Sequence, residues 1–351
     1  MKLAILPGDD IGPEIVDATL MALAAADRRF GLELQFEPHE VGMASHRRNG
    51  TTLPERVIEA AIAADGVVLG PAGMTAYPPI DEGGVNIPGT IRKRLDLFAN
   101  IRPARSRQGL PKALQGMDCV IVRENTEGFY ADRNLFAGSG EFMPTPDCAM
   151  SVRRITAKAS RRIAGVAFAM AERRSNRVTV VGKRHVLRMT DGLFVREVEA
   201  EASAHPGVVL REVDVDAMAA ELYLAPERHD VILTTNMFGD ILSNQAVAQS
   251  GGLGLAAALN VGDNHAAANA GHGSAPDIAG RGIANPAGLI LSAAMLMRWW
   301  SERSSNAAYL AAAAAIEGSV DEVLKVQGLR TTDLGGSGST RSFADAVAAR
   351  L

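Results

Sequence analysis

The chain has 351 residues, of which 36 are lysine or arginine and 40 are aspartate or glutamate, so its formal net charge is −4. This balance argues against a dedicated nucleic-acid-binding protein, and 47% hydrophobic with 22% charged residues excludes wholesale disorder. The length predicts about two domains.

Two cysteines, Cys119 and Cys148, are too few for a disulfide framework and suit a reducing compartment. The longest apolar stretch runs from Ala287 to Met297, well short of the roughly 20 residues that a membrane span needs. We therefore expect a cytoplasmic protein whose partners are small molecules, with no nucleic-acid or membrane partner.

Short apolar runs alternate with amphipathic segments along the chain. The predicted strands are 2–6, 32–37, 66–69, 119–122, 177–181, 208–213 and 231–234. The predicted helices are 12–29, 54–63, 156–174, 189–204 and 237–249, segment 90–97 is amphipathic and arginine-rich, and the C-terminal third is expected to be mainly alanine-rich helix. Segment 133–153 has no helical period and carries glycines and prolines, which favours an extended arm. This alternation predicts an α/β fold with helices on the faces of a sheet.

Glycines follow the first predicted strand, but the run GDDIG (Gly8–Gly12) lacks the spacing of G-x-G-x-x-G. A Rossmann or P-loop site is therefore not supported. The run GGLGL (Gly251–Leu255) is flexible loop material that would, alone, more often be a structural turn.

Arginines cluster in the segment IRKRLDLFANIRP, where Arg92 and Arg102 lie close in sequence, and Arg123 follows a buried strand. Forked guanidinium donors match carboxylate or phosphate oxygens, so converging arginines favour an anionic substrate. The alternative is a solvated basic face.

Acidic and amide side chains occur near two predicted helix starts. Asp214 and Asp216 lie in DVDAMAAEL, and Asp240 and Asn244 lie four residues apart on one helical face. Such hard oxygen ligands suit Mg²⁺ or Mn²⁺, although acidic capping of a helix N-terminus explains them equally well. The loop His272–Pro286, dense in glycine, proline and polar groups, is more often functional than idle.

Taken together, these blocks resemble the isocitrate/isopropylmalate dehydrogenase family of β-hydroxyacid oxidative decarboxylases. The blocks that carry the resemblance are GDDIGPE, LDLFANIRP, VRENTEGFY, TTNMFGDILS, GGLGL, HGSAPDIAG, IANP and TTDLGG, and they span almost the whole chain.

The resemblance implies an isopropylmalate dehydrogenase-like two-domain α/β fold, with a mixed sheet flanked by helices and not a Rossmann fold. It implies a discontinuous cofactor-binding domain, 1–97 plus 251–351, and a central domain, 98–250, that holds the dimer contact and the arm (about 133–153). It also implies a homodimer whose active sites, in clefts, are shared between subunits.

The resemblance assigns the substrate's carboxylates to Arg92, Arg102 and Arg123, and proton transfer to Tyr130 and to Lys183 from the partner subunit. It assigns the metal, Mg²⁺ or Mn²⁺, to Asp240, Asn244 and the partner's Asp216. The cofactor-binding residues that it implies are His272, Gly273, Ser274, Ala275, Asp277, Asn285 and Asn269. Because Asp277 would repel a 2′-phosphate, it favours NAD over NADP.

Three residues depart from the family pattern. Asn244 stands where a second metal-helix aspartate is usual, Asn269 where a glutamate is usual, and His185 where an asparagine is usual. The loss of a charge at Asn244 predicts weaker Mg²⁺ affinity.

Substrate selection is expected just before Arg92, where VNIPGT (85–90) lacks the leucine pair of isopropylmalate enzymes. Asn86 and Thr90 predict a small, moderately polar pocket. Isocitrate or homoisocitrate ranks first and tartrate or D-malate next, with 3-isopropylmalate below them. A catalytically silent regulatory subunit of the family is the alternative to an enzyme.

Overall fold

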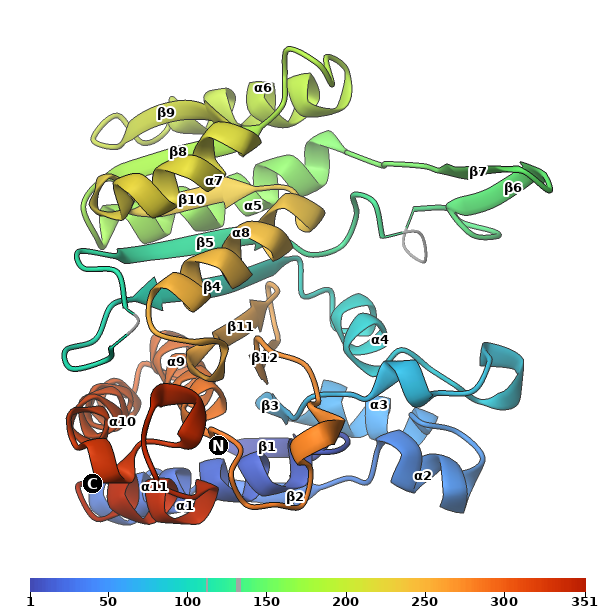
Figure 1. Cartoon of the computed structure of the whole chain (residues 1–351). Coiled ribbons are helices and arrows are strands. Elements are labelled where there is room, and N and C mark those ends of the chain that lie inside the picture. Colours follow the sequence, from blue (N-terminus) through green and yellow to red (C-terminus); the bar gives the residue numbers. More distant parts are fainter. Residues whose placement is uncertain (112, 131–133) are drawn as a thin grey trace. The chain divides into compact units, whose positions relative to one another are not determined.

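The computed structural model describes residues 1–111, 113–130 and 134–351, which form two compact units (Figure 1). Unit 1 contains Met1–Leu97, Ser106–Ala113 and Ser250–Leu351, and unit 2 contains Phe98–Arg105 and Leu114–Gln249. These bounds differ from the predicted ones at Ser106–Ala113 and at Ser250, all of which were expected in the central domain. The segment belongs to unit 1, where Arg107 Nε donates a 2.8 Å hydrogen bond to Asp321 Oδ1.

Unit 1 contains strands β1 (Lys2–Leu6), β2 (Gln35–Pro38), β3 (Gly66–Leu69), β11 (Ala257–Val261) and β12 (Ala266–Ala270). Their spatial order is β2-β1-β3-β12-β11. β1 pairs in parallel with β2 and β3, β12 pairs in parallel with β3, and β11 pairs antiparallel with β12. All four residues of β3 are buried, as expected for a parallel strand covered on both faces.

The helices of unit 1 are α1 (Gly12–Phe30), α2 (Gly42–Asn49), α3 (Glu55–Ala63), α4 (Ile87–Arg94), α9 (Ala287–Ser304), α10 (Ala307–Lys325) and α11 (Thr340–Ala348). α1 shows why the local sequence folds as it does. Proline at position 13 suits its first turn, and Gly31 ends it in the left-handed conformation with φ 63°. The turn before α1 needs Gly8 (φ 76°), because an added Cβ would lie 2.1 Å from the carbonyl oxygen of Pro71.

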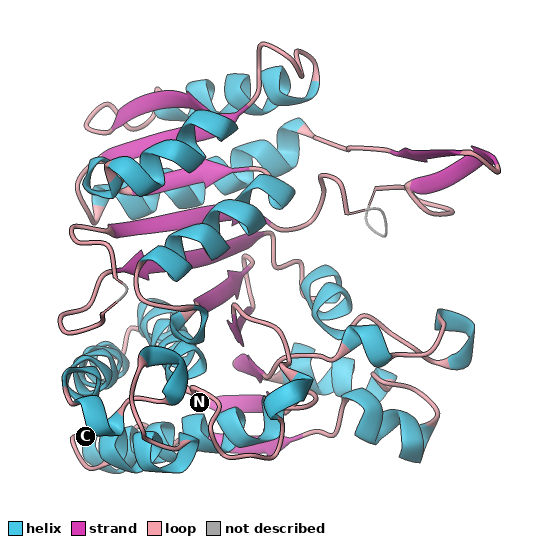
Figure 2. Ribbon diagram, viewed as in Figure 1, coloured by secondary structure: helices cyan, strands magenta, loops and turns pink. Residues whose placement is uncertain are grey.

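Unit 2 contains strands β4 (Ala99–Arg105), β5 (Asp118–Glu124), β8 (Arg177–Gly182), β9 (Val209–Asp214) and β10 (Val231–Thr234) in the spatial order β4-β5-β10-β8-β9. β4 is antiparallel to β5, and the other neighbours are parallel. Its helices are α5 (Ala157–Glu172), α6 (Thr190–Ala202), α7 (Val215–Leu224) and α8 (Asn236–Gln249). α5 and α6 cover one face of this sheet, and α7 and α8 cover the other (Figure 2).

The predicted arm, 133–153, contains a two-stranded hairpin of β6 (Glu141–Thr145) and β7 (Cys148–Ser151); its first residue, 133, lies outside the described residues. The hairpin projects from unit 2 (Figure 1). Its apolar side chains are exposed: Phe142 is 46%, Met143 62% and Met150 49% accessible.

The predicted α/β class, with mixed strand directions and flanking helices, is confirmed. The C-terminal third is mainly helical, as expected, because α8, α9, α10 and α11 lie there. It also contains β11 and β12, which were not expected and which form the antiparallel pair of unit 1. Throughout the described ranges, no helix combines the length and apolar character that crossing a membrane requires.

Candidate active site

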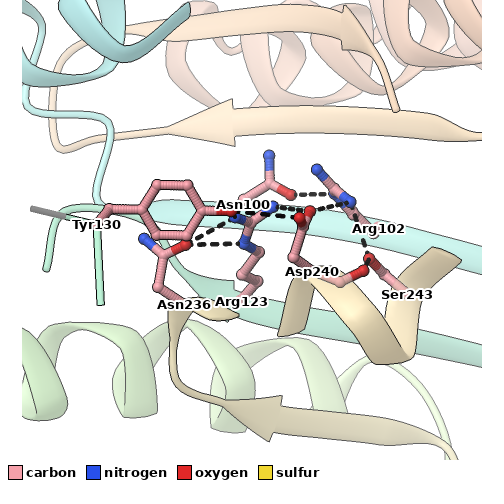
Figure 3. A network of polar contacts seen from close by, with 7 residues as sticks. All are labelled: Asn100, Arg102, Arg123, Tyr130, Asn236, Asp240 and Ser243. Carbon is pink, nitrogen blue, oxygen red and sulfur yellow. Dashed lines mark hydrogen bonds and ion pairs between the residues drawn. The ribbon is translucent and has the colours of Figure 1, made fainter. Parts of the chain in front are cut away.

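A polar network in unit 2 joins β4, β5, the segment after β5 and α8 (Figure 3). Its members are Asn100, Arg102, Arg123, Tyr130, Asn236, Asp240 and Ser243. The alternation of side chains along β4 places Asn100 and Arg102 on one face of the strand. Asn236, Asp240 and Ser243 lie three or four residues apart on α8, so they share one face of that helix.

Arg123 is the centre of this network, and its side chain is only 2% exposed. Its Nη1 pairs with Asp240 Oδ1. Its Nη2 donates to Tyr130 Oη at 3.1 Å and to Asn236 Oδ1 at 2.7 Å, and its Nε donates to the same Oδ1 at 3.2 Å. Gly239 permits this packing, because a Cβ there would lie 2.6 Å from Arg123 Cγ.

Arg102 approaches Asp240 from β4. Its Nη1 donates to Asp240 Oδ1 at 3.1 Å and to Ser243 Oγ at 2.9 Å, and its Nε donates to Asn100 Oδ1 at 2.6 Å. Burial, and next the neighbouring Arg123 cation, lower the pKa of the Arg102 guanidinium to about 10. Among the seven residues of the network, two cations thus face one carboxylate, and the excess positive charge suits a further carboxylate from a ligand.

Tyr130 brings a hydroxyl to the same carboxylate. Its Oη donates to Asp240 Oδ2 at 3.2 Å and accepts from Arg123, whose guanidinium also lies 5.5 Å from the tyrosine ring centroid. A phenol held between a cation and a carboxylate has defined proton partners, which general acid catalysis requires.

Lys183 and Asp216 form a second cluster in unit 2. Lys183 Nζ pairs with Asp216 and with Asp214 Oδ2 at 3.2 Å, and His185 Nδ1 lies 3.2 Å from the same Asp214 oxygen. The hydrogen bond to Asp216, and then the one to Asp214, raise the pKa of Lys183, and Lys183 lowers the pKa of Asp216. Within the described chain, Asp216 therefore bonds to Lys183 and not to Asp240.

The predicted metal ligands are not gathered within one chain. Across the described residues, no group of three or more His, Cys, Asp and Glu side chains could hold a metal ion. Asp240 and Asn244 do share a face of α8, both are partly exposed, and their oxygens are of the kind that Mg²⁺ and Mn²⁺ prefer. The oxygens of Asp240 and Asn244 suit such an ion, which would need further ligands from outside this helix.

Three predicted substrate-binding residues lie on α4 or at its start, in unit 1. Asn86 caps this helix, because its Oδ1 accepts a 2.9 Å hydrogen bond from Gly89 N, and this oxygen is therefore used within the helix cap. Thr90 and Arg92 follow within the helix and are half-buried.

The predicted cofactor residues come from β12 and the loop after it, in unit 1. Asn269 Nδ2 donates to the Leu69 carbonyl at 3.0 Å and ties β12 to β3. Gly273 is exposed, and a Cβ there would meet nothing within 4 Å. The Ser274 carbonyl accepts from Ile11 N at 3.2 Å, which joins this loop to the turn after β1. Ala275 takes the left-handed conformation with φ 43°, and Asp277 is exposed.

Two further groups of this loop bear on a ligand. His272 Nε2 is buried and has no hydrogen-bond partner in the part of the chain that the structure describes, and burial lowers the pKa of the ring. Asn285 Nδ2 donates to Asp333 Oδ2 at 3.0 Å. An unused buried nitrogen and an open carboxylate at Asp277 fit a nucleotide that both donates and accepts hydrogen bonds.

Sequence reasoning missed Asn100, Asn236 and Ser243 in the network, and Asp333 beside the loop. Asn100 could have been found from its i, i+2 spacing to Arg102, and Asn236 from its position directly after a buried strand. Asp333 lies in TTDLGG, one of the blocks that carry the resemblance, but its contact with Asn285 arises only from the fold.

The chain matches the family described as isocitrate/isopropylmalate dehydrogenase over residues 2–347. It is 40% identical to the isocitrate/homoisocitrate dehydrogenase of Thermus thermophilus, covering 100% of this chain and 98% of that protein. It is 39% identical to the 3-isopropylmalate dehydrogenase of Methanothermobacter thermautotrophicus, again over 100% and 98%. The solved isocitrate dehydrogenase of Methylococcus capsulatus superposes with a TM-score of 0.87 at 37% identity, covering 99% of this chain and 98% of that one.

These matches extend over both units and agree with the sequence blocks that carry the network and the loop. The chain therefore belongs to the isocitrate/isopropylmalate dehydrogenase family of decarboxylating dehydrogenases, which act on a CH–OH group.

Proposed function

We propose that this chain is an NAD-dependent, divalent-metal-dependent enzyme that oxidatively decarboxylates a malate-type 2-hydroxy acid. Isocitrate or homoisocitrate is the first choice of substrate, tartrate or D-malate the second and 3-isopropylmalate the third. The observation that carries the proposal is the network in which Arg102, Arg123 and Tyr130 converge on Asp240.

The two arginines would bind and orient a substrate carboxylate, because each presents a forked donor from a rigid strand. Tyr130 would deliver a proton to carbon after CO₂ is lost, with Arg123 and Asp240 holding its hydroxyl in place. Arg92, Asn86 and Thr90 keep their proposed roles toward the substrate.

Lys183 from a second copy of the chain, or an aspartate relayed through water, would take the proton from the substrate hydroxyl. Its raised pKa means that it is protonated in its present pairing, so acting as a base requires that pairing to loosen. The Asp216 carboxylate, which accepts a hydrogen bond from Lys183 Nζ, would have to move away from the lysine.

The metal would be held by Asp240 and Asn244, with Asp216 coming from a second copy of the chain in a homodimer. When bound, a divalent cation and NAD supply Lewis acidity and a hydride acceptor. We assign the nucleotide to His272, Gly273, Ser274, Ala275, Asn285 and Asn269, and its ribose hydroxyls to Asp277. We also propose that the unit with residues 1–97 binds the cofactor and that the central unit, with its arm, carries the dimer contact.

The test is a panel of hydroxy acids offered to the purified protein with Mg²⁺ or Mn²⁺ and either NAD or NADP, with kcat/KM measured for each. We expect reduced cofactor and CO₂ together, with isocitrate or homoisocitrate turned over best. A preference for 3-isopropylmalate would reverse our ranking. Reduced cofactor from no acid at all would favour the silent regulatory subunit.

A further inference from the structure

The backbone of Lys183 is tied to a buried carboxylate. Its amide nitrogen donates a 2.7 Å hydrogen bond to Asp191 Oδ2, and the Asp191 side chain is fully buried. Because Lys183 follows directly after β8, this bond determines how the chain leaves the strand and where the lysine side chain begins.

The other oxygen of Asp191 pairs with Arg153, whose side chain is 6% exposed. The same guanidinium donates to Thr190 Oγ1 at 2.9 Å and to Thr235 Oγ1 at 3.0 Å. A carboxylate that is paired and hydrogen-bonded on both oxygens inside a protein has very little freedom to move.

Arg153 also contacts the neighbours of the Asp240 network. Its guanidinium lies 5.4 Å from the ring of Phe129, the residue before Tyr130, and 5.3 Å from the ring of Phe238 on α8. Thr235, which it also bonds, directly precedes Asn236, the acceptor for Arg123. The buried Arg153 guanidinium thus connects, through Asp191, the backbone of Lys183 to the segments that carry Tyr130, Arg123 and Asp240.

We propose that Arg153 is a positioning residue for Lys183, acting through Asp191, so that the lysine side chain leaves β8 from a fixed point and is presented in one orientation to the active site of a second copy of the chain. This inference rests on the proposed function, because it gives Lys183 a part in proton transfer. A proton-transfer group displaced by about 1 Å can lose roughly two orders of magnitude in rate, so such a fixed starting point matters for turnover.

The experiment is a double-mutant cycle in the full-length protein, after the wild type has been shown to turn over a hydroxy acid. Arg153→Met is measured in the wild-type background and in a Lys183→Ala background. We expect Arg153→Met to lower kcat roughly 10- to 100-fold in the first, with a smaller change in the KM of the hydroxy acid. In the Lys183→Ala background we expect Arg153→Met to lower kcat by less than about threefold, because the lysine side chain that Arg153 positions is already absent.

Two further variants separate positioning from folding. Asp191→Asn retains an oxygen for the Lys183 amide and loses the ion pair. Arg153→Lys retains the charge and loses the forked guanidinium. The kcat of both variants should lie between those of Arg153→Met and the wild type. Arg174→Met is the matched control, because Arg174 also pairs with a buried carboxylate of unit 2, Asp230, yet contacts the edge of β5. It should lower the unfolding temperature without producing the interaction with Lys183→Ala.

Equal losses of kcat from Arg153→Met in both backgrounds would overturn the inference, as would no loss in either. A wild type that oxidises no hydroxy acid would instead overturn the proposed function, and this inference with it. An active wild type whose cycle is additive leaves the proposed function standing and removes Arg153 from it.

Discussion

The network around Asp240 and the loop after β12 use polar side chains in opposite ways. In the network, the side chains bond mainly to one another, and the arginines are buried and braced before any ligand arrives. In β12 and the loop after it, Asn269 and Asn285 hydrogen-bond to the backbone or to a neighbouring side chain, Asp277 is exposed, and His272 Nε2 has no hydrogen-bond partner among the described residues. The network is therefore preorganised as a unit, whereas the loop offers separate contacts that can be changed one at a time.

The largest effect should come from the centre of the network. Arg123→Lys keeps the charge but loses the fork that contacts Tyr130, Asn236 and Asp240. We expect kcat/KM to fall about a thousandfold and stability to fall by about 3 kcal/mol, because a buried pair is disrupted. Arg174→Lys, at a partly buried pair remote from the network, should lose stability alone; an equal loss of kcat/KM there would argue against a preorganised network.

The next largest effect should come from the phenol. Tyr130→Phe removes the proposed proton donor, and general acid catalysis contributes about 100- to 10,000-fold, so kcat should fall by at least about 100-fold while substrate binding changes little. Tyr77→Phe is the matched control, because Tyr77 also donates to an aspartate, Asp9 Oδ2, at 2.5 Å, but in unit 1. Its kcat should stay within about threefold of the wild type, and a Tyr130→Phe enzyme that keeps full kcat would exclude the tyrosine as donor.

A smaller effect should follow from adding charge on α8. Asn244→Asp places a carboxylate one turn from Asp240, and the extra charge should tighten Mn²⁺ binding about tenfold, measured by titration calorimetry. Gln245→Glu adds the same charge one residue further along and should leave the affinity unchanged. Identical affinities for Asn244→Asp and the wild type would show that Asn244 does not face the ion.

The smallest effect should arise in the loop. Asp277→Asn removes the charge expected to repel a 2′-phosphate, so the ratio of kcat/KM with NAD to that with NADP should fall about tenfold, with kcat for NAD nearly unchanged. Asp263→Asn removes an exposed carboxylate elsewhere in unit 1 and should not alter the ratio. If both variants changed the ratio alike, a general loss of negative charge would be the cause rather than a local contact.

Local sequence predicted the buried strands well, because runs such as Gly66–Leu69 are apolar throughout and end at turn residues. It failed at β11 and β12, where alanine's helix propensity is outweighed by pairing with each other and with β3. It also missed β4, because Asn100 and Pro103 are unfavourable in strands, although β4 pairs with β5.

The candidate site shows the same limit. Spacing alone put Asp240 and Asn244 on one helical face, but Arg102 and Asp240 are 138 residues apart in sequence and meet only through the fold. The resemblance to a family supplied that connection. The bracing residues Asn100, Asn236 and Ser243 were not identified, because their roles exist only as partners of the buried arginines.

The β6–β7 hairpin bears on how the protein should respond to dilution. Two strands with Phe142, Met143 and Met150 in solvent are marginal by themselves, so their order depends on whatever covers those side chains. If a second copy of the chain covers them, as the proposed homodimer requires, assembly and stability are linked by mass action. The melting temperature should then rise with protein concentration, and Phe142→Ser should weaken that dependence.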